Sequence, residues 1–252
     1  NVNTLVISNI CDRFGNCKVS KGISFTPVWA EPGDVIITEI MADPVPAVLL
    51  PEKEYLEITN RTQYTLDLKN WSLYGDEQKT GFPDVKIDPG AYIILCQENH
   101  AQDFSRFGKP IGIKSFPVLT DVGKTLVLPD SMGTMIHGLK YSPEWYGNKL
   151  KEDGGWSLEM IDTGFPFFTA GNWEASSSGK GGTPGAVNSV SRNNPDPSFY
   201  GIQNLFPQDS LTIRIKFSET VTGFSGNTSA FFAEGSSVLS VFDDDPGWTE
   251  FI

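Results

Sequence analysis

Short runs of alternating apolar and polar residues dominate the chain, and this period of two predicts β-strands. The run VIITEIM at 35–41 is typical, and EYLEITN and LTIRIKF repeat the pattern further along. Alternation in the first run places Val35, Ile37, Glu39 and Met41 on one face, and Ile36, Thr38 and Ile40 on the other. Because Gly, Pro, Asn and Asp separate the runs, the pattern predicts an all-β protein.

One segment departs from this period and predicts a helix. The residues NHAQDFSRFG begin with Asn99, a good N-cap, and place Gln102 at the capping-box position. Gly108 would end the helix, because glycine readily adopts the left-handed conformation after a last turn. We therefore expect a helix over residues 99–108.

Composition and charge narrow the class of protein. Hydrophobic residues make up 39% of the 252 residues, which is ordinary for a folded globular chain. The formal net charge of −12, without clustered basic residues, disfavours nucleic acid as a partner. No apolar run approaches the roughly 20 residues of a membrane span. Because the chain starts without methionine and stops in a strand-like run, we expect it to be an interior piece of a longer protein.

A set of motifs occurs in the order typical of one domain family. The motifs are ITEIMADP, EYLEITNRTQYTLDLKNWSLYGD, IDPGAYIILC, GWSLEMID and NWEASSSGKGGTPGAVNS. In this order they resemble the bacterial lamin-tail domain family, over residues 33–191. The resemblance implies an immunoglobulin-like β-sandwich in multidomain extracellular or envelope-associated proteins, without a known catalytic centre of its own.

The glycine-rich stretch GKGGTPGAVNS, residues 179–189, raises the question of a phosphate-binding loop. A P-loop needs G-x-x-x-x-G-K-[ST] followed by a helix, so that backbone N–H groups converge on phosphate. Here Lys180 precedes most of the glycines, Pro184 lacks an N–H group, and no helical period follows. The lamin-tail resemblance instead identifies the stretch as the C-terminal signature of that domain.

The two ends of the chain resemble parts of a different domain. LTIRIKFSETV is similar to the first core strand of bacterial surface-type immunoglobulin-like repeats, and LVISNICDRFGN to the end of such a repeat. We therefore expect three parts: residues 1–30, residues 33–191 and residues 195–252. Neither end piece alone would bury enough apolar surface. We expect the ends to pair into a second, partial immunoglobulin-like β-sandwich, in cis or between molecules.

Two cysteines give information on the cellular compartment of the protein. Cys11 and Cys17 flank the turn DRFGN between two strand-like runs. Residues on the two sides of such a hairpin loop face each other closely enough for a disulfide, and the alternative is a pair of free thiols. A disulfide fits an oxidising compartment, and with the resemblance it leads us to expect a secreted or cell-envelope protein. Cys96 is interpreted as a small apolar residue inside a strand.

Glu39 and Glu57 lie on neighbouring predicted strands and are the candidate catalytic pair. Glycoside hydrolysis needs two carboxyl groups in a cleft, one of them with a raised pKa. No substrate-positioning motif accompanies the pair. We therefore favour a structural role, in which each glutamate binds loop N–H groups or a nearby basic residue.

Candidates for metal ligation are weaker. Asp243, Asp244 and Asp245 could offer oxygen ligands to calcium, but the run lacks EF-hand spacing and precedes a Pro-Gly turn. His100 and His137 are isolated in different segments, and no Cys and His spacing matches a zinc site. We therefore expect neither a metal nor a cofactor.

Aromatic side chains gather in the loop-rich region that follows residue 140. The candidate ligand-binding residues are Tyr141, Trp145 and Tyr146, with Phe165, Phe167 and Phe168 further along. Exposed rings could stack on sugar faces or anchor a protein partner, whereas rings folded inward would pin the loops. We favour the inward arrangement.

These observations favour a non-catalytic module that positions neighbouring domains of a modular bacterial protein. The expected partners are those domains, with a polysaccharide or a surface protein as further candidates. The alternatives are a carbohydrate-binding module centred on Trp145 and, more distantly, a hydrolase that uses Glu39 and Glu57.

Overall fold

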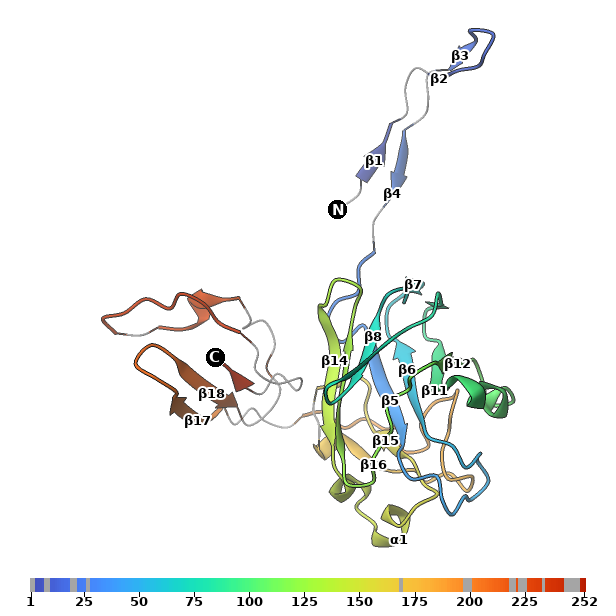
Figure 1. Cartoon of the computed structure of the whole chain (residues 1–252), viewed down its shortest axis with the longest axis vertical. Helices are drawn as coiled ribbons and strands as arrows, with labels where there is room; N and C mark the ends of the chain where they lie inside the picture. The colour runs from blue at the N-terminus through green and yellow to red at the C-terminus, as the bar shows by residue number, and fades with distance from the viewer. Residues whose placement is uncertain are drawn as a thin grey trace. The chain divides into compact units, whose positions relative to one another are not determined.

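The computed structural model of the chain divides into two compact units, residues 1–30 and residues 31–252. It describes residues 3–6, 10–18, 22–25, 28–167, 170–196, 201–217, 221, 226–232, 234–242 and 250–252. Figure 1 shows that strands dominate the chain, and the all-β prediction is confirmed.

The first unit is built from two short antiparallel strand pairs. They are β1 (Asn3–Leu5) with β4 (Ile23–Phe25), and β2 (Ile10–Cys11) with β3 (Cys17–Lys18). The turn between β2 and β3 is closed by the Asp12 carboxylate, which accepts hydrogen bonds from the Phe14 and Asn16 amides. Gly15 supplies the left-handed conformation that this tight turn requires, with φ +84°.

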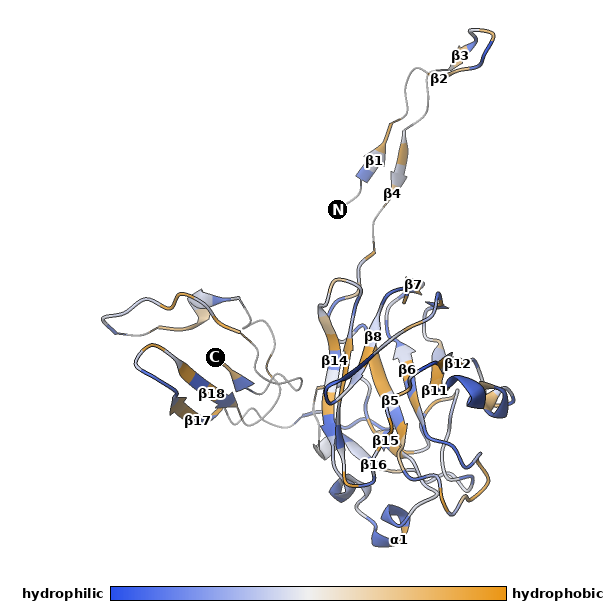
Figure 2. Ribbon diagram, in the orientation of Figure 1, coloured by the Kyte–Doolittle hydropathy of each residue, from blue (hydrophilic) through white to orange (hydrophobic). Residues whose placement is uncertain are grey.

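The second unit contains a six-stranded sheet that carries most of its buried residues. Its order is β12 (Pro110–Ile113), β11 (Tyr92–Gln97), β6 (Tyr55–Asn60), β5 (Val35–Met41), β15 (Leu158–Met160) and β16 (Trp173–Ala175). The strands β5 and β6 are buried along their whole length. Figure 2 shows β5 as one of the most hydrophobic ribbons, whereas β6, which contains Glu57, Thr59 and Asn60, is paler.

A four-stranded sheet covers one face of the six-stranded sheet. Its order is β14 (Met135–Tyr141), β13 (Lys124–Pro129), β8 (Ser72–Gly75) and β9 (Gln78–Gly81). The two sheets meet where β14 contacts β5, and the backbone N–H of Ile37 there donates to Nδ1 of His137, 3.3 Å away. Apolar side chains such as Leu73 and Leu126 are fully buried between the sheets, which is the arrangement of a β-sandwich.

Shorter elements complete the second unit. They are the strand pair β7 (Leu66–Asp67) and β10 (Lys86–Ile87), the 3₁₀ turns η1 (Glu98–Phe104), η2 (Pro143–Tyr146), η3 (Ala170–Asn172) and η4 (Thr228–Ala230), and the helix α1 (Lys149–Glu152). The expected helix over residues 99–108 is confirmed only in part, because the chain forms the short 3₁₀ helix η1 over Glu98–Phe104. Gln97, rather than Asn99, is the residue before its first turn, and no side chain caps it.

A β-bulge in β5 overturns the expected faces of that strand. The ladder pairs Ile37 with Ile58 and then Glu39 with Glu57, so Thr38 is an extra residue. Directly paired residues share a face, which places Val35, Ile37 and Ile40 on the face toward the four-stranded sheet, and Ile36, Glu39 and Met41 on the outer face. The prediction that Val35 and Ile37 lie beside Glu39 was therefore wrong.

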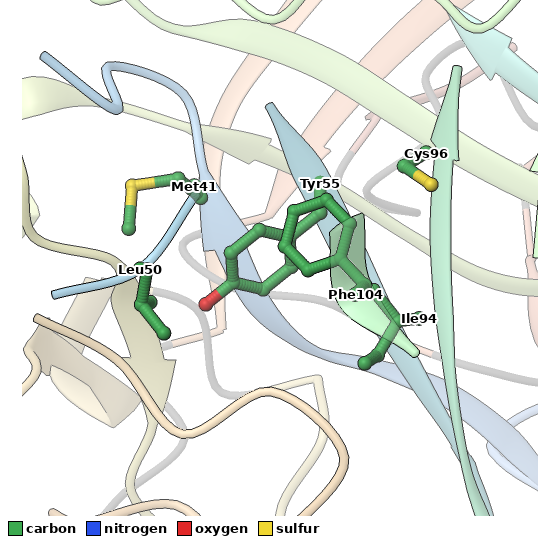
Figure 3. Close-up of a cluster of buried hydrophobic side chains, with 6 residues drawn as sticks. All are labelled: Met41, Leu50, Tyr55, Ile94, Cys96 and Phe104. Atoms are coloured by element: carbon green, nitrogen blue, oxygen red, sulfur yellow. The ribbon is translucent and has the colours of Figure 1, made fainter. Parts of the chain in front are cut away.

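The outer face of the six-stranded sheet has its own apolar cluster. It consists of Met41, Leu50, Tyr55, Ile94, Cys96 and Phe104. Figure 3 shows the Tyr55 ring beside that of Phe104, with its hydroxyl directed away from Cys96 and toward Leu50. The centroids of these two rings are 5.2 Å apart in an edge-to-face arrangement. The Tyr55 hydroxyl thus reaches the polar part of this face.

The C-terminal residues form a small sheet of their own. Its strands β17 (Ile202–Pro207), β18 (Ile213–Phe217) and β19 (Glu250–Phe251) pair in sequence order. Phe217, Val221, Val241 and Phe251 bury one another, whereas every residue of β17 is exposed. Pairing of the two chain ends into one sandwich stays a prediction. Within the described ranges, no helix is long and apolar enough to cross a membrane.

Candidate functional site

Three glutamates form a row across the outer face of the six-stranded sheet. Glu57 on β6 pairs with Glu39 on β5, and Glu39 pairs in turn with Glu159 on β15. All three side chains are fully buried. The expectation from sequence that Glu39 and Glu57 lie on neighbouring strands agrees with this ladder. Glu159 was not singled out, although it lies in the motif GWSLEMID. We call these three residues the carboxylate row.

The glycine-rich segment at residues 176–191, here called the closing segment, covers the carboxylate row. Its backbone amides of Thr183, Gly185 and Val190 donate to Glu39, Glu57 and Glu159, over 2.8, 2.6 and 3.2 Å respectively. The hydroxyls of Thr183 and Ser189 donate to the two oxygens of Glu159, over 2.8 and 2.7 Å. Each glutamate is therefore bound by the chain's own closing segment.

Donors from the sheet complete the hydrogen bonds of the row. Oε1 of Glu39 accepts from the Tyr55 and Ser157 hydroxyls, each 2.6 Å away, in addition to the Thr183 amide. Oε1 of Glu57 accepts from the hydroxyl of Thr38, the extra residue of the bulge, over 2.8 Å. The bulge therefore has a local role, because it brings this hydroxyl to the carboxylate row.

Glycines allow the closing segment to approach this closely. A Cβ on Gly182 would lie 2.6 Å from both Oε1 of Glu39 and the Tyr55 hydroxyl. A Cβ on Gly185 would lie 2.1 Å from the Phe107 carbonyl oxygen, and this residue also has φ +80°. Gly182 and Gly185 are thus explained by close packing on Glu39, Tyr55 and the Phe107 backbone, which agrees with our rejection of a phosphate loop.

Burial and the repulsion between neighbouring carboxylates raise the pKa values of Glu39 and Glu57. Burial, followed by the charge of Glu159, raises the pKa of Glu39 to about 7. Burial, followed by the charge of Glu39, raises the pKa of Glu57 well above its usual range. Oε2 of Glu39 is buried and has no hydrogen-bond partner within the described part of the chain.

Further contacts fix the C-terminal end of this domain next to the carboxylate row. The Asn188 side-chain amide donates to the carbonyl oxygens of Thr38 and Met160, 2.8 Å from each, and so links β5 to β15. Arg192 then donates its backbone N–H to Ile161 and forms an ion pair with Glu174, 2.7 Å away. The closing segment therefore crosses the sheet, and Arg192 after it binds the edge strand β16 and Ile161 after β15.

The chemistry of this arrangement differs from that of a glycosidase. A glycosidase presents two carboxyl groups to a cleft that admits the sugar. Here Glu39 and Glu57 are fully buried, and their bound oxygens contact the chain's own hydroxyls and amides. The site can hold protons and fasten a loop, but in this closed form it offers no access to a polymeric substrate.

Of the aromatic loop residues, Tyr141 and Tyr146 fold inward, as we favoured, whereas Phe165 is exposed. Tyr141 and Tyr146 are 2% and 6% exposed, which contradicts a flat exposed platform formed with Trp145. Trp145 is half-buried and stacks on Trp173, with ring centroids 5.9 Å apart. The Tyr141 hydroxyl accepts from the Thr120 amide and donates to the Thr120 carbonyl, and so pins the preceding loop. Phe168 lies outside the described residues.

The structure also places the remaining candidates. Cys11 and Cys17 form a disulfide, and Cys96 is a buried free thiol whose pKa burial raises to about 11. His137 is buried, with Nε2 donating to the Pro166 carbonyl 3.1 Å away, and burial lowers its pKa to about 4. Asp243, Asp244 and Asp245 lie outside the described residues.

Other surfaces offer no stronger site. No group of three or more His, Cys, Asp or Glu is arranged to hold a metal ion in the portion that the structure describes. A surface hollow of about 680 Å³ lies on the four-stranded sheet, where Tyr74, Lys79 and Asp130 are among its lining residues. Neither the carboxylate row nor the aromatic loop lines this hollow.

Comparison with known proteins identifies the central domain. Residues 30–143 match the family model of the Lamin Tail Domain. No curated protein matches the chain. The match ends before β15, β16 and the closing segment, which complete the same sheet in the structure. Residues 30–143 are therefore lamin-tail-like, and their strands belong to an immunoglobulin-like β-sandwich.

Proposed function

We propose that this chain is a non-catalytic structural module of a modular bacterial protein, secreted or held in the cell envelope, and that it positions neighbouring domains. The immunoglobulin-like fold is compatible with such a role, although a fold alone does not determine function. The proposal therefore depends on how the domain holds the segments that precede and follow it.

The observation that carries the proposal is that the first and last residues of the domain meet at one end of the sheet. The Arg61 backbone N–H donates to the Asp34 carbonyl, and its guanidinium donates to the Gly33 carbonyl over 2.8 Å. The carboxylates of Asp34 and Asp162 both act electrostatically on Arg61. Asp162 in turn accepts from the Asn194 amide, 2.7 Å away. One network thus spans from Asp34 to Asn194.

This network would fix the directions in which the flanking segments leave the domain. The carboxylate row strengthens it, because the closing segment that leads to Asn194 is bound to β5, β6 and β15. Domains whose ends lie close together can be placed between two parts of a larger protein without separating them. We infer that the domain acts as a rigid junction rather than as an extended spacer.

The two alternatives have less support. The hydrolase alternative needs an accessible carboxylate pair, whereas Glu39 and Glu57 are buried under the closing segment. The carbohydrate-binding alternative needs exposed rings, whereas two of its three candidate rings, Tyr141 and Tyr146, are buried. No observation favours either over the junction.

A distance measurement in the intact chain tests the junction. Spin labels can be attached at Glu31 and Asn193, which are both exposed. Double electron–electron resonance would then report the distance between the two flanking segments. The proposal predicts one narrow distance distribution, which broadens in the Arg61→Ala variant but not in Arg106→Ala, an exposed arginine on another element. A distribution that is already broad in the wild-type protein would overturn the proposal.

A further inference from the structure

We propose that the carboxylate row is a proton-binding site that couples protonation to docking of the closing segment. The segment stays docked while the row holds a proton, and it loosens when the row is fully ionised. This inference goes beyond the junction proposed above, and it rests on the geometry of Glu39, Glu57 and Glu159.

The first argument is the spacing of the carboxylates. Glu57, Glu39 and Glu159 occupy directly paired positions on three adjacent strands. Side chains at such positions have Cβ atoms only about 4.5–5.5 Å apart, and like charges placed there destabilise a sheet. Two buried carboxylates at close range do not both ionise readily, so one of them retains a proton.

The second argument is the surroundings of the row. On β6 the ionisable neighbours are Tyr55 and Glu57, and on β15 the neighbour is Glu159. Tyr92 on β11 is affected by the charge of Glu57. Glu174 on β16 is the direct ladder partner of Glu159 and forms its own ion pair with Arg192. Of the ion pairs among the described residues, none includes a member of the row. No cation therefore replaces the proton.

The third argument is the unpartnered oxygen of Glu39. Its Oε1 accepts three hydrogen bonds, whereas its buried Oε2 has no donor in the described part of the structure. A buried anionic oxygen without a donor costs free energy, and protonation removes that cost. Ionisation of Glu39, at the centre of the row, therefore opposes the closed form.

The direction of the coupling follows from linkage. The pKa of Glu39 is raised from 4.5 to about 7 in the folded protein, and that of Glu57 is also raised, both chiefly by burial. The closed form thus binds protons more tightly than an open form would. Its stabilisation by these groups is full below about pH 4.5 and is lost as the pH rises through about 7.

A titration of the glutamate carboxyl carbons by NMR, on the full chain labelled at these carbons, tests the proposal. We expect two glutamates with raised midpoints, one of them near 7, and we expect the Thr183 and Gly185 amides to lose protection from exchange over the same pH range. Rates are corrected for the intrinsic pH dependence of amide exchange. The midpoints belong to the coupled row, so no assignment to one residue is needed.

Two variants sharpen this test. Glu39→Gln keeps the acceptor at Oε1 and removes one of the two charges. It should therefore abolish one of the two raised midpoints and keep both amides protected to a higher pH than in the wild type. Glu77→Gln neutralises an exposed glutamate between β8 and β9, on the other sheet, and should leave both signals unchanged. If every glutamate of the folded wild-type protein titrates below about pH 5.5, or if protection does not change with pH, the proposal fails. This wild-type result decides the matter even if a variant does not fold.

Discussion

The Glu39 carboxylate and the Thr183 amide are joined by a hydrogen bond of 2.8 Å across 144 residues of sequence. This bond connects the first long strand of the domain with the segment that ends it. Because Tyr55 and Ser157 donate to the same oxygen, three distant parts of the chain meet at one atom. Folding of the domain and docking of the closing segment are therefore linked.

Substitution of Gly182 tests how closely the closing segment packs. In Gly182→Ala the new Cβ would lie 2.6 Å from Oε1 of Glu39 and from the Tyr55 hydroxyl, so the segment has to move. We expect the free energy of unfolding in urea to fall by about 1–3 kcal/mol. Gly179→Ala is the matched control, because its Cβ would meet nothing within 4 Å. Equal stability of the two variants would refute the packing argument.

Asn188 tests the link between β5 and β15. Asn188→Asp keeps the size of the side chain but removes the donors to the Thr38 and Met160 carbonyls, and it adds a charge near the carboxylate row. We expect a loss of about 2–4 kcal/mol in the free energy of unfolding, since two buried acceptors lose their donors. Asn193→Asp changes an exposed residue of the same type and should stay within about 0.5 kcal/mol of the wild type. A loss no larger than that of the control would show that the link is dispensable.

His137 should remain neutral in the folded protein at physiological pH. Its Nδ1 accepts from the Ile37 amide and its Nε2 donates to the Pro166 carbonyl, an arrangement that only the neutral ring can make. Burial lowers its pKa from 6.5 to about 4. Its stabilisation is therefore full above pH 6.5 and is lost as the pH falls toward 4, opposite in direction to that of Glu39. NMR of the ring carbons should show a midpoint below about 5, and a midpoint near 6.5 would contradict this burial.

The opposition between His137 and Glu39 has a practical consequence. Their pH windows overlap between about 4.5 and 6.5, where one group loses stabilisation and the other gains it. The total stability of the protein can then appear independent of pH in this range. Site-specific titrations and comparisons of matched variants are therefore needed to measure the contribution of His137 or of Glu39 to stability.

Trp145 should act in stability rather than in ligand binding. Trp145→Ala removes the stacking on Trp173, and we expect a fall of about 1–3 kcal/mol in the free energy of unfolding. Phe165→Ala, which truncates an aromatic ring that is 38% exposed, should cost less. On a glycan array the folded wild-type chain should show no saturable binding. Binding that Trp145→Ala abolishes while the fold is retained would restore the carbohydrate-binding alternative.

The strand pattern and the role of the glutamates could be read from the sequence for definite reasons. Alternation located β5 and β6, because each strand has one face toward the other sheet and one toward a partly polar cover. The excess of acidic residues without a substrate-positioning motif favoured a structural role for Glu39 and Glu57. In the structure, this structural role consists of binding the backbone N–H groups of the closing segment.

Other features depend on contacts that no local pattern encodes. The bulge at Thr38 is invisible in an alternating run, because it is determined by pairing with β6 and by the hydroxyl contact with Glu57. Glu159 resembles any other glutamate on a strand until β15 is placed beside β5. The helix signals at Asn99 and Gln102 were overridden, because Phe104 packs into the cluster with Tyr55 from a 3₁₀ turn. A weak local preference yields to tertiary burial in such a case.

The measurement that tests the account most directly is amide hydrogen exchange in the closing segment of the full chain at about pH 6. The amides of Thr183 and Gly185 donate to Glu39 and Glu57, whereas Gly179 is an exposed residue of the same segment. We predict that the first two exchange on the order of a thousandfold more slowly than Gly179, at rates similar to those of the β5 and β6 amides. Equal, fast exchange at all three positions would contradict the claim that the carboxylate row binds the closing segment.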